Sequence, residues 1–301
     1  MRITWPLTLI ALAFVACSGG DQPKAETTGQ PQADPRVEAT IAAIATPAPA
    51  ASTAELKELP LSDLSPEAVA YLEGREGPAG VAVAVPSSGA VYTWNGHEKF
   101  HMASIAKVGI MLAVMDQASK ADRQLTEEEL SYLRPMITVS DNETASILWN
   151  RIGGGQAVED YLRSIGLTEV DPNKETCWGA SYASAHDMAL LFAKLALGEI
   201  LDDETRRVAI DLLQQVDPSQ TWGVIAAAPD ERPDGTIVGV KDGWYPADCG
   251  WWVNSAGMLL PATDKPAYTM AVLTGQQSSW EYGIETIESV GRMVHERLHA
   301  P

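Results

Sequence analysis

A serine and a lysine three residues apart, Ser104 and Lys107, begin a long apolar run with helical character. If Ser104 begins a helix, Lys107 lies about one turn further on the same face, where its amine can reach the serine hydroxyl. An alcohol is a poor nucleophile until a base removes its proton, and a lysine kept neutral by burial or by a second cation can be that base. The pair therefore indicates nucleophilic catalysis, although a helix cap at Ser104 and a solvated Lys107 fit the same residues.

Two further short groups carry side chains of the same kinds. Ser140-Asp141-Asn142 follows an apolar run and precedes a helical stretch, and Lys241-Asp242-Gly243 comes directly after the strand-like segment 236–240. Each has a simpler interpretation. Ser140 and Glu143 fit a capping box, and Lys241 fits a solvated lysine in the turn after a strand.

Taken in order, Ser-x-x-Lys, Ser-Asp-Asn and Lys-x-Gly on a strand are the three signatures of class A β-lactamases and penicillin-binding proteins. The chain resembles that superfamily over about residues 54–301, and it is most similar to the class A β-lactamase-like serine hydrolases of exported bacterial proteins. Each motif is weak alone, but the ordered set is specific.

The resemblance implies a role for each matching side chain. Ser104 would be the nucleophile, Lys107 its base, and Ser140 the relay that carries a proton to the leaving group. Asn142 would contact both the substrate and Lys107. These roles are what acyl transfer requires, namely a nucleophile, a base and a proton shuttle.

The resemblance also places the Lys241 strand across the cleft from the nucleophile. Lys241 would supply a positive field, and Gly243 and Trp244 would line the substrate. The backbone N–H groups of Ser104 and Trp244 would form the oxyanion hole. Trp244 would lie at the mouth of the cleft, where it could stack on the substrate. No metal and no cofactor is implied.

The first departure from the family is the missing deacylation motif. Class A β-lactamases carry a Glu-x-x-Leu-Asn loop whose glutamate activates water, and no such sequence occurs here. The stretch 167–185, where that loop belongs, looks shorter than in the family. Glu175 is the nearest stand-in for the base, although a surface acid fits it as well.

The second departure is Asp242, which replaces the Thr or Ser that binds a substrate carboxylate in the family. A carboxylate there would repel a substrate carboxylate, and no arginine or histidine follows before Glu288 to compensate. Asp242 could instead pair with Lys241 and fix its charge. Both departures argue against efficient hydrolysis of penicillins and suggest a neutral or cationic substrate.

The sequence thus predicts a serine hydrolase that forms an acyl-enzyme on an amide or ester, such as a β-lactam or a cell-wall peptide. One alternative is a true β-lactamase that uses Glu175 or another deacylation base. A second is a penicillin-binding or sensor-type protein that turns over little or not at all. We expect a monomer that acts on a small molecule or on a peptidoglycan-like substrate.

The sequence does not predict a functional site that contains histidines. His295-Glu296-Arg297-Leu298-His299 matches the zinc-protease pattern His-Glu-x-x-His. That site needs a third ligand, and the pattern lies in the last turns of a helix at the end of this sequence, so we do not expect zinc catalysis there. His97, His101 and His186 have no partner spacing that suggests a site.

The elements that must position these groups form two sets of strands around a block of helices. Strand patterns occupy residues 81–85, 91–94, 236–240, 250–255 and 267–273, and helical patterns fill most of 104–215, with further helices at 65–73 and 284–298. The arrangement predicts an α/β (α+β) domain of the β-lactamase/transpeptidase type: a five-stranded antiparallel sheet flanked by helices, with an inserted all-helical lobe at about 104–215.

Composition bears on partners and location. The formal net charge is −19, from 40 acidic and 21 basic residues, which argues against nucleic acid or an anionic membrane surface as a partner.

Residues 1–16 have the form of a signal peptide, and Cys17 before Ser-Gly-Gly resembles a lipoprotein processing site. We therefore expect an exported protein, lipid-anchored to the cell membrane through Cys17 or else secreted. Residues 17–53 read as a flexible Ala/Thr/Pro-rich tether before the domain 54–301.

Two cysteines remain after the processing site, Cys177 and Cys249. In an oxidising compartment such a pair can form a disulfide, which we predict, with two free buried thiols as the alternative.

Overall fold

The computed structural model describes residues 52–174, 177–226, 228, 235–263 and 265–299. The predicted signal peptide, Cys17, most of the tether and Glu175 lie outside the described residues. Within them, no helix is both long and apolar enough to cross a membrane.

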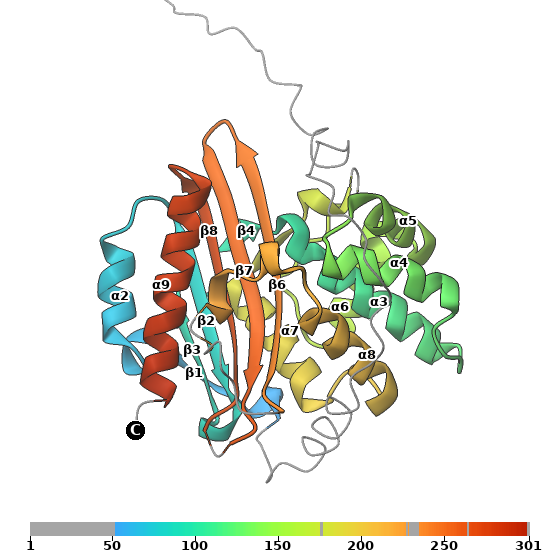
Figure 1. The fold of residues 1–301 in the computed structure, drawn as a ribbon, viewed down its shortest axis with the longest axis horizontal. Helices are drawn as coiled ribbons and strands as arrows, with labels where there is room; N and C mark the ends of the chain where they lie inside the picture. The colour runs from blue at the N-terminus through green and yellow to red at the C-terminus, as the bar shows by residue number, and fades with distance from the viewer. Residues whose placement is uncertain (1–51, 175–176, 227, 229–234, 264, 300–301) are drawn as a thin grey trace, which may run out of the picture.

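The centre of the fold is a sheet in which six of the described strands pair in the order β1-β3-β2-β8-β7-β6 (Figure 1). All neighbouring pairs are antiparallel except β1 and β3, which are parallel. The strands are β1 (Lys57–Pro60), β2 (Ala79–Val85), β3 (Ala90–Trp94), β6 (Ile237–Ala247), β7 (Gly250–Leu260) and β8 (Tyr268–Gln277). The predicted fold class is confirmed, and the five predicted strands form one antiparallel sheet.

The sequence analysis missed the edge strand β1. Its four residues, Lys-Glu-Leu-Pro, are mostly exposed, so they carry no apolar alternation. A short, charged strand that ends in proline is typical of a sheet edge, because it offers little backbone for further pairing.

Strand β6 is longer than predicted, and this changes the position of the lysine motif. Lys241, Asp242 and Gly243 do not end the strand but lie in its middle, paired with Ala256, Ser255 and Asn254 of β7. The interpretation of this motif as a turn is therefore wrong. Pairing along the full length of β7 outweighs the local turn tendency of Asp-Gly.

Helices cover both faces of the sheet (Figure 1). α9 packs on one face with α2 beside it, and α7 packs on the other face against β2, β7 and β8. The remaining helices form the lobe beside β6. The bounds are α2 (Pro66–Glu73), α3 (Ala106–Lys120), α4 (Glu127–Thr138), α5 (Asn142–Ile152), α6 (Gly154–Ser164), α7 (Ala185–Leu197), α8 (Asp203–Gln214) and α9 (Trp280–His299).

Helix α3 is the centre of the helical lobe. Every residue from Ala106 to Met115 is buried, because α4, α5, α6 and α8 surround it. A helix that is apolar on all sides is stable in water only when neighbouring elements cover all of its faces. Its first turn is therefore held rigidly, and that turn carries Lys107.

A small second sheet leads the chain into this helix. β4 (Lys99–His101) pairs antiparallel with β5 (Tyr182–Ser184), and the 3₁₀ turn Ala103–Ile105 follows β4 directly. The Met102 N–H donates to the Ser181 carbonyl at 2.9 Å. The small sheet thus fixes the entry to α3 from one side.

The predicted disulfide is wrong. Cys249 is a free, exposed thiol in the turn between β6 and β7, so it does not bridge to Cys177. Residue spacing cannot show that the two cysteines belong to different parts of the fold, one at a hairpin tip and one beside Trp178.

Candidate active site

Ser104 lies in the 3₁₀ turn immediately before α3 and is partly exposed. It does not cap the helix, since the capping position is Ile105, without a side-chain hydrogen bond. The preceding residue, Ala103, has a φ of 47°. A non-glycine residue in the left-handed region is strained and must be held by its surroundings. The Ser104 hydroxyl is thus left available at the N-terminal end of α3, where partial positive charge favours an anion.

The sequence analysis missed the groups that hold this turn. The Ala103 N–H donates to His101 Nδ1 at 3.3 Å, and Asn254 Nδ2 donates to the His101 carbonyl at 2.7 Å. The His101 ring stacks on Tyr245, with ring centroids 4.9 Å apart. Burial lowers the pKa of His101 to about 4, so it is a neutral acceptor. No local pattern marks these residues, because they come from three separate strands.

Lys107 is fully buried, and its amine is bound by the Ser140 loop. Lys107 Nζ donates to Ser140 Oγ at 3.0 Å, to Asn142 Oδ1 at 2.8 Å and to the Ser140 carbonyl. It also lies 4.6 Å from the centroid of the Trp178 ring. Among the described residues, no hydrogen bond joins Lys107 to the Ser104 hydroxyl.

The environment of Lys107 favours its neutral form. Burial lowers the pKa of Lys107 well below its usual value, and the charge of Lys241 lowers it further, against an opposing effect of Asp141. After loss of one of the three protons that it donates here, the Lys107 amine can act as a base.

Ser140 connects the two lysines. Its Oγ accepts from Lys107 Nζ at 3.0 Å and from Lys241 Nζ at 3.1 Å. The capping-box interpretation of Ser140 is wrong, because Asp141 is the cap of α5 and accepts from the Thr144 N–H at 2.7 Å. Ser140 itself has a φ of 57°, so a strained backbone turns its hydroxyl towards the lysines.

Lys241 is also fully buried. Its amine donates to Ser140 Oγ and, at 3.1 Å, to the backbone carbonyl of Asp242. Burial lowers the pKa of Lys241 to about 8, although the Asp242 carboxyl works in the opposite direction. Burial thus lowers the pKa of both lysines, and the Asp242 carboxyl favours the charged form of Lys241.

Asp242 lies on the other side of β6 from Lys241, as alternation along a strand requires. It is fully buried opposite Ser255, and neither carboxyl oxygen has a hydrogen-bond partner in the described part of the chain. Burial raises the pKa of Asp242 well above its usual value, against the effects of Ser255 and Lys241. No ion pair between Asp242 and Lys241 is formed among the described side chains. A buried, neutral carboxyl would not repel a substrate carboxylate.

Gly243 brings β6 against the serine turn. A Cβ atom at this position would lie 2.7 Å from the Met102 carbonyl and 2.8 Å from the Ser104 nitrogen. Any side chain would separate the strand from the turn. β6 lies at one edge of the six-stranded sheet, and this position allows its backbone to lie beside Ser104.

Trp244 belongs to an aromatic cluster next to this strand. Its ring centroid lies 6.0 Å from that of Trp222 and 6.3 Å from that of Trp280. Trp244 is half-buried. Its packing fixes the backbone just after Gly243.

The His-Glu-x-x-His residues lie in the last turns of α9. Nδ1 of His295 is 3.1 Å from the Tyr268 hydroxyl, and Nε2 of His299 is 3.1 Å from the Pro266 carbonyl. One ring nitrogen of each histidine is thus used in packing α9 on β8 and on the segment before it.

Comparisons with known proteins agree with this architecture. A family model described as the β-lactamase enzyme family matches residues 64–132 and 129–298. A curated relative from Mycobacterium tuberculosis, described as "Putative lipoprotein LppW", is 27% identical over 192 residues, which cover 60% of this chain and 59% of the relative. The chain therefore spans less than two thirds of that protein's length.

Solved structures show the same fold. The TLA-3 extended-spectrum β-lactamase is 19% identical, with a TM-score of 0.69 over 79% of this chain and 98% of that one. PBP-A is 23% identical, with a TM-score of 0.68 over 80% of this chain and 97% of that one.

Proposed function

The chain belongs to the β-lactamase enzyme family, and we propose that it is a serine hydrolase that forms an acyl-enzyme at Ser104 on an amide or ester substrate. The observation that carries the proposal is the convergence of Lys107 and Lys241 on the Ser140 hydroxyl, beside a serine that caps no helix. Each buried lysine costs free energy, so a purely structural role would not favour two buried amines on one hydroxyl.

The first step is attack on the carbonyl carbon. Ser104 Oγ forms the new C–O bond while the neutral Lys107 amine takes its proton, and the carbonyl π electrons move onto oxygen. Backbone N–H groups of Ser104 and Trp244 would stabilise that oxyanion, since β6 lies against the serine turn.

The second step is loss of the leaving group. The tetrahedral intermediate collapses, the C–N or C–O bond breaks, and Ser140 Oγ gives its proton to the leaving atom. Lys107, now an ammonium, returns a proton to Ser140 along their 3.0 Å hydrogen bond. The acyl ester on Ser104 is then hydrolysed by water, with Glu175 as the candidate base.

A β-lactam is a second candidate substrate, favoured by the burial of Asp242. Repulsion of a substrate carboxylate requires a charged Asp242, whereas burial raises the pKa of this carboxyl and favours its neutral form. Lys241 would then face the substrate carboxylate without opposition. A third candidate is a penicillin-binding or sensor-type protein with little turnover, favoured by the missing Glu-x-x-Leu-Asn loop.

Intact mass spectrometry tests these candidates. The protein is mixed with benzylpenicillin and, separately, with a fluorophosphonate probe, with Ser104→Ala beside both. We expect a fluorophosphonate adduct that Ser104→Ala abolishes. A penicilloyl adduct that decays rapidly would identify a β-lactamase, and one that persists a penicillin-binding protein. Absence of any adduct on the folded protein would refute the acyl-enzyme.

We also propose that the protein is exported and lipid-anchored through Cys17. The processing-site sequence supports this, as does similarity to a relative that is described as a lipoprotein. Fractionation of producing cells should place the protein with the membrane, and Cys17→Ser should release it or leave it unprocessed. A wild-type protein recovered in the cytoplasm would contradict the proposal.

A further inference from the structure

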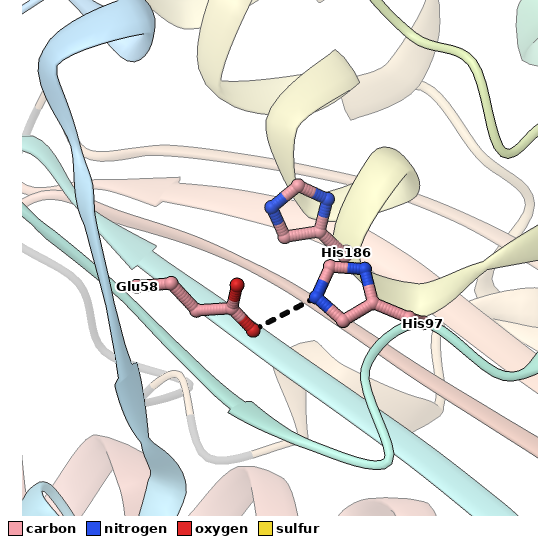
Figure 2. Close-up of side chains that lie close together, drawn as sticks. All are labelled: Glu58, His97 and His186. Atoms are coloured by element: carbon pink, nitrogen blue, oxygen red, sulfur yellow. Dashed lines mark hydrogen bonds and ion pairs between the residues drawn. The ribbon is translucent and has the colours of Figure 1, made fainter.

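Two histidines that are far apart in the sequence meet at the edge of the sheet, away from the serine site. His97 lies in the connection between β3 and β4, and His186 lies in the first turn of α7. Their ring centroids are 4.6 Å apart, at an interplanar angle of 37°. Glu58, from the edge strand β1, extends its carboxylate towards His97 (Figure 2). No partner for either histidine can be found from sequence, because the connection between β3 and β4 meets α7 only in the fold.

We propose that Glu58, His97 and His186 bind a Zn²⁺ ion. Each of the three side chains offers one ligand atom, and these atoms all lie within 4.8 Å of one another. Imidazole nitrogen and carboxylate oxygen are typical zinc ligands, with bonds of about 2.0–2.2 Å. Tetrahedral ligands at those bond lengths lie about 3.3–3.6 Å apart. Pairs near the 4.8 Å limit must therefore close by about 1 Å, and the His97–Glu58 pair, at 2.9 Å, must open by about 0.5 Å.

The exposure of the cluster allows that closure. The His97 side chain is 48% exposed and that of Glu58 is 43% exposed, so both can adjust without disturbing the core. His186 is less exposed, at 19%, and is the fixed member of the set. Solvent can fill a fourth coordination position, as at zinc sites with three protein ligands.

A second carboxylate holds His97 in the orientation that a metal needs. His97 Nδ1 is 2.8 Å from Glu169 Oε1, and Glu169 Oε2 accepts from Ser184 Oγ at 2.6 Å. With Nδ1–H donating to Glu169, the other nitrogen, Nε2, faces Glu58 Oε1 at 2.9 Å. A proton on Nε2 fills this contact in the absence of metal, and Zn²⁺ can take its place once the two atoms move apart to tetrahedral spacing. A carboxylate that orients a ligating histidine is the usual outer shell of a zinc site.

His186 has a similar partner. Its Nδ1 is 3.4 Å from Asp187 Oδ1, and the other Asp187 oxygen accepts from the Glu169 N–H at 2.6 Å. Glu58, Glu169 and Asp187 together place three carboxylates around two imidazoles. A divalent cation offsets this excess of negative charge.

Bound zinc would connect three segments: the edge strand β1, the connection that leads through β4 to Ser104, and the start of α7. The site is separate from the Ser104 chemistry, so we expect the ion to stabilise the fold and not to take part in the reaction. Its measurable effect is stabilisation of the folded chain, by mass action, in proportion to ln(1 + [Zn²⁺]/Kd).

Isothermal titration calorimetry of the full chain with ZnCl₂ tests the proposal. The variants are His97→Gln and His186→Gln, with Glu169→Gln as the orienting carboxylate. His295→Gln and Cys249→Ser are matched controls, since they remove the other candidate zinc ligands. Circular dichroism without metal checks that each variant folds.

We expect one Zn²⁺ per chain, loss of binding in both histidine variants, and affinity about 10–100-fold weaker in Glu169→Gln. The controls should bind as the wild type does. Absence of zinc binding would overturn the proposal, as would binding that survives in either His97→Gln or His186→Gln or disappears in a control. If a histidine variant does not fold, Glu169→Gln, which keeps all three proposed ligands, decides the matter. Affinity weakened about 10–100-fold supports the proposal, whereas complete loss of binding would make Glu169 itself a ligand and overturn it.

Discussion

Lys107 and Lys241 donate to the same oxygen, the Oγ of Ser140, from 3.0 and 3.1 Å. One amine comes from the first turn of the buried helix α3 and the other from the middle of strand β6. Two ammonium groups at this separation would repel strongly in a buried site, so the pair favours one neutral and one charged lysine. Burial and the charge of Lys241 lower the pKa of Lys107, so our proposal takes Lys107 as the member that becomes neutral.

The first prediction concerns the pH dependence of acylation. The rate should rise with pH as Lys107 loses its proton, because the base must be neutral, and Lys107 does so well below its usual pKa. It should fall above about pH 8, where Lys241 loses the charge that supports Ser140. A bell-shaped profile of fluorophosphonate labelling is therefore expected.

The matched variant for this profile is Lys241→Arg. A guanidinium stays charged throughout the range, so the descending limb should disappear even if the maximum rate drops. A descending limb that stays near pH 8 in Lys241→Arg would assign it to another group.

The second prediction removes the base. Lys107→Met should slow labelling at Ser104 about 10²–10⁴-fold, the usual contribution of general base catalysis. Lys120→Met is the control, because Lys120 lies on the same helix but is exposed and forms an ion pair with Asp116. Labelling of Lys107→Met at the wild-type rate would show that another group activates Ser104.

The site shows where sequence reasoning is strong and where it fails. The ordered motifs name the residues that the fold brings together, because Lys107, Ser140, Asn142 and Lys241 are all linked by hydrogen bonds. Their catalytic roles stay predictions. The cap of α5 could not be assigned from sequence, since Ser140 and Asp141 are both good caps and only the strained turn at Ser140 decides between them.

The remaining errors concern contacts between distant segments. β1 is too short and polar to be recognised, and the length of β6 depends on its pairing with β7. The burial of Asp242 follows from that pairing, because Ser255 of β7 lies directly opposite. The proximity of His97 to His186 likewise depends on how α7 lies against the sheet. None of these relationships has a local sequence pattern.

The third prediction concerns stability and Asp242. Its pKa is raised in the folded state, so the folded chain keeps a proton that the unfolded chain releases. The free energy of unfolding therefore decreases as pH rises above the unfolded pKa of about 3.9. An asparagine side chain cannot ionise, so Asp242→Asn should remove this loss and raise Tm at pH 8. In a chain of about this size each 1 kcal/mol corresponds to about 2–4 °C.

Thermal unfolding of both proteins between pH 4 and pH 8 measures the effect. The difference in Tm should shrink towards pH 4, where about half of the unfolded chains have regained the Asp242 proton. Asp248→Asn is the control, an exposed aspartate at the tip of the same hairpin, and should change Tm little. A lower Tm for Asp242→Asn at pH 8 would mean that Asp242 is ionised and stabilised by Lys241.

The fourth prediction tests the contact between strand β6 and the serine turn. Gly243→Ala adds a Cβ that would lie 2.7 Å from the Met102 carbonyl and 2.8 Å from the Ser104 nitrogen. Both atoms belong to the backbone, so the strand and the turn must move apart, and the oxyanion donors of Ser104 and Trp244 then separate. A displacement of about 1 Å can reduce a rate about 10²-fold, which is the loss we expect in fluorophosphonate labelling. Gly74→Ala is the control, because its Cβ would make ordinary contacts, at 3.5 Å with the Tyr71 carbonyl and at 3.9 Å with the Ala70 carbonyl. Full labelling of a folded Gly243→Ala protein would show that the spacing between β6 and Ser104 does not control the reaction.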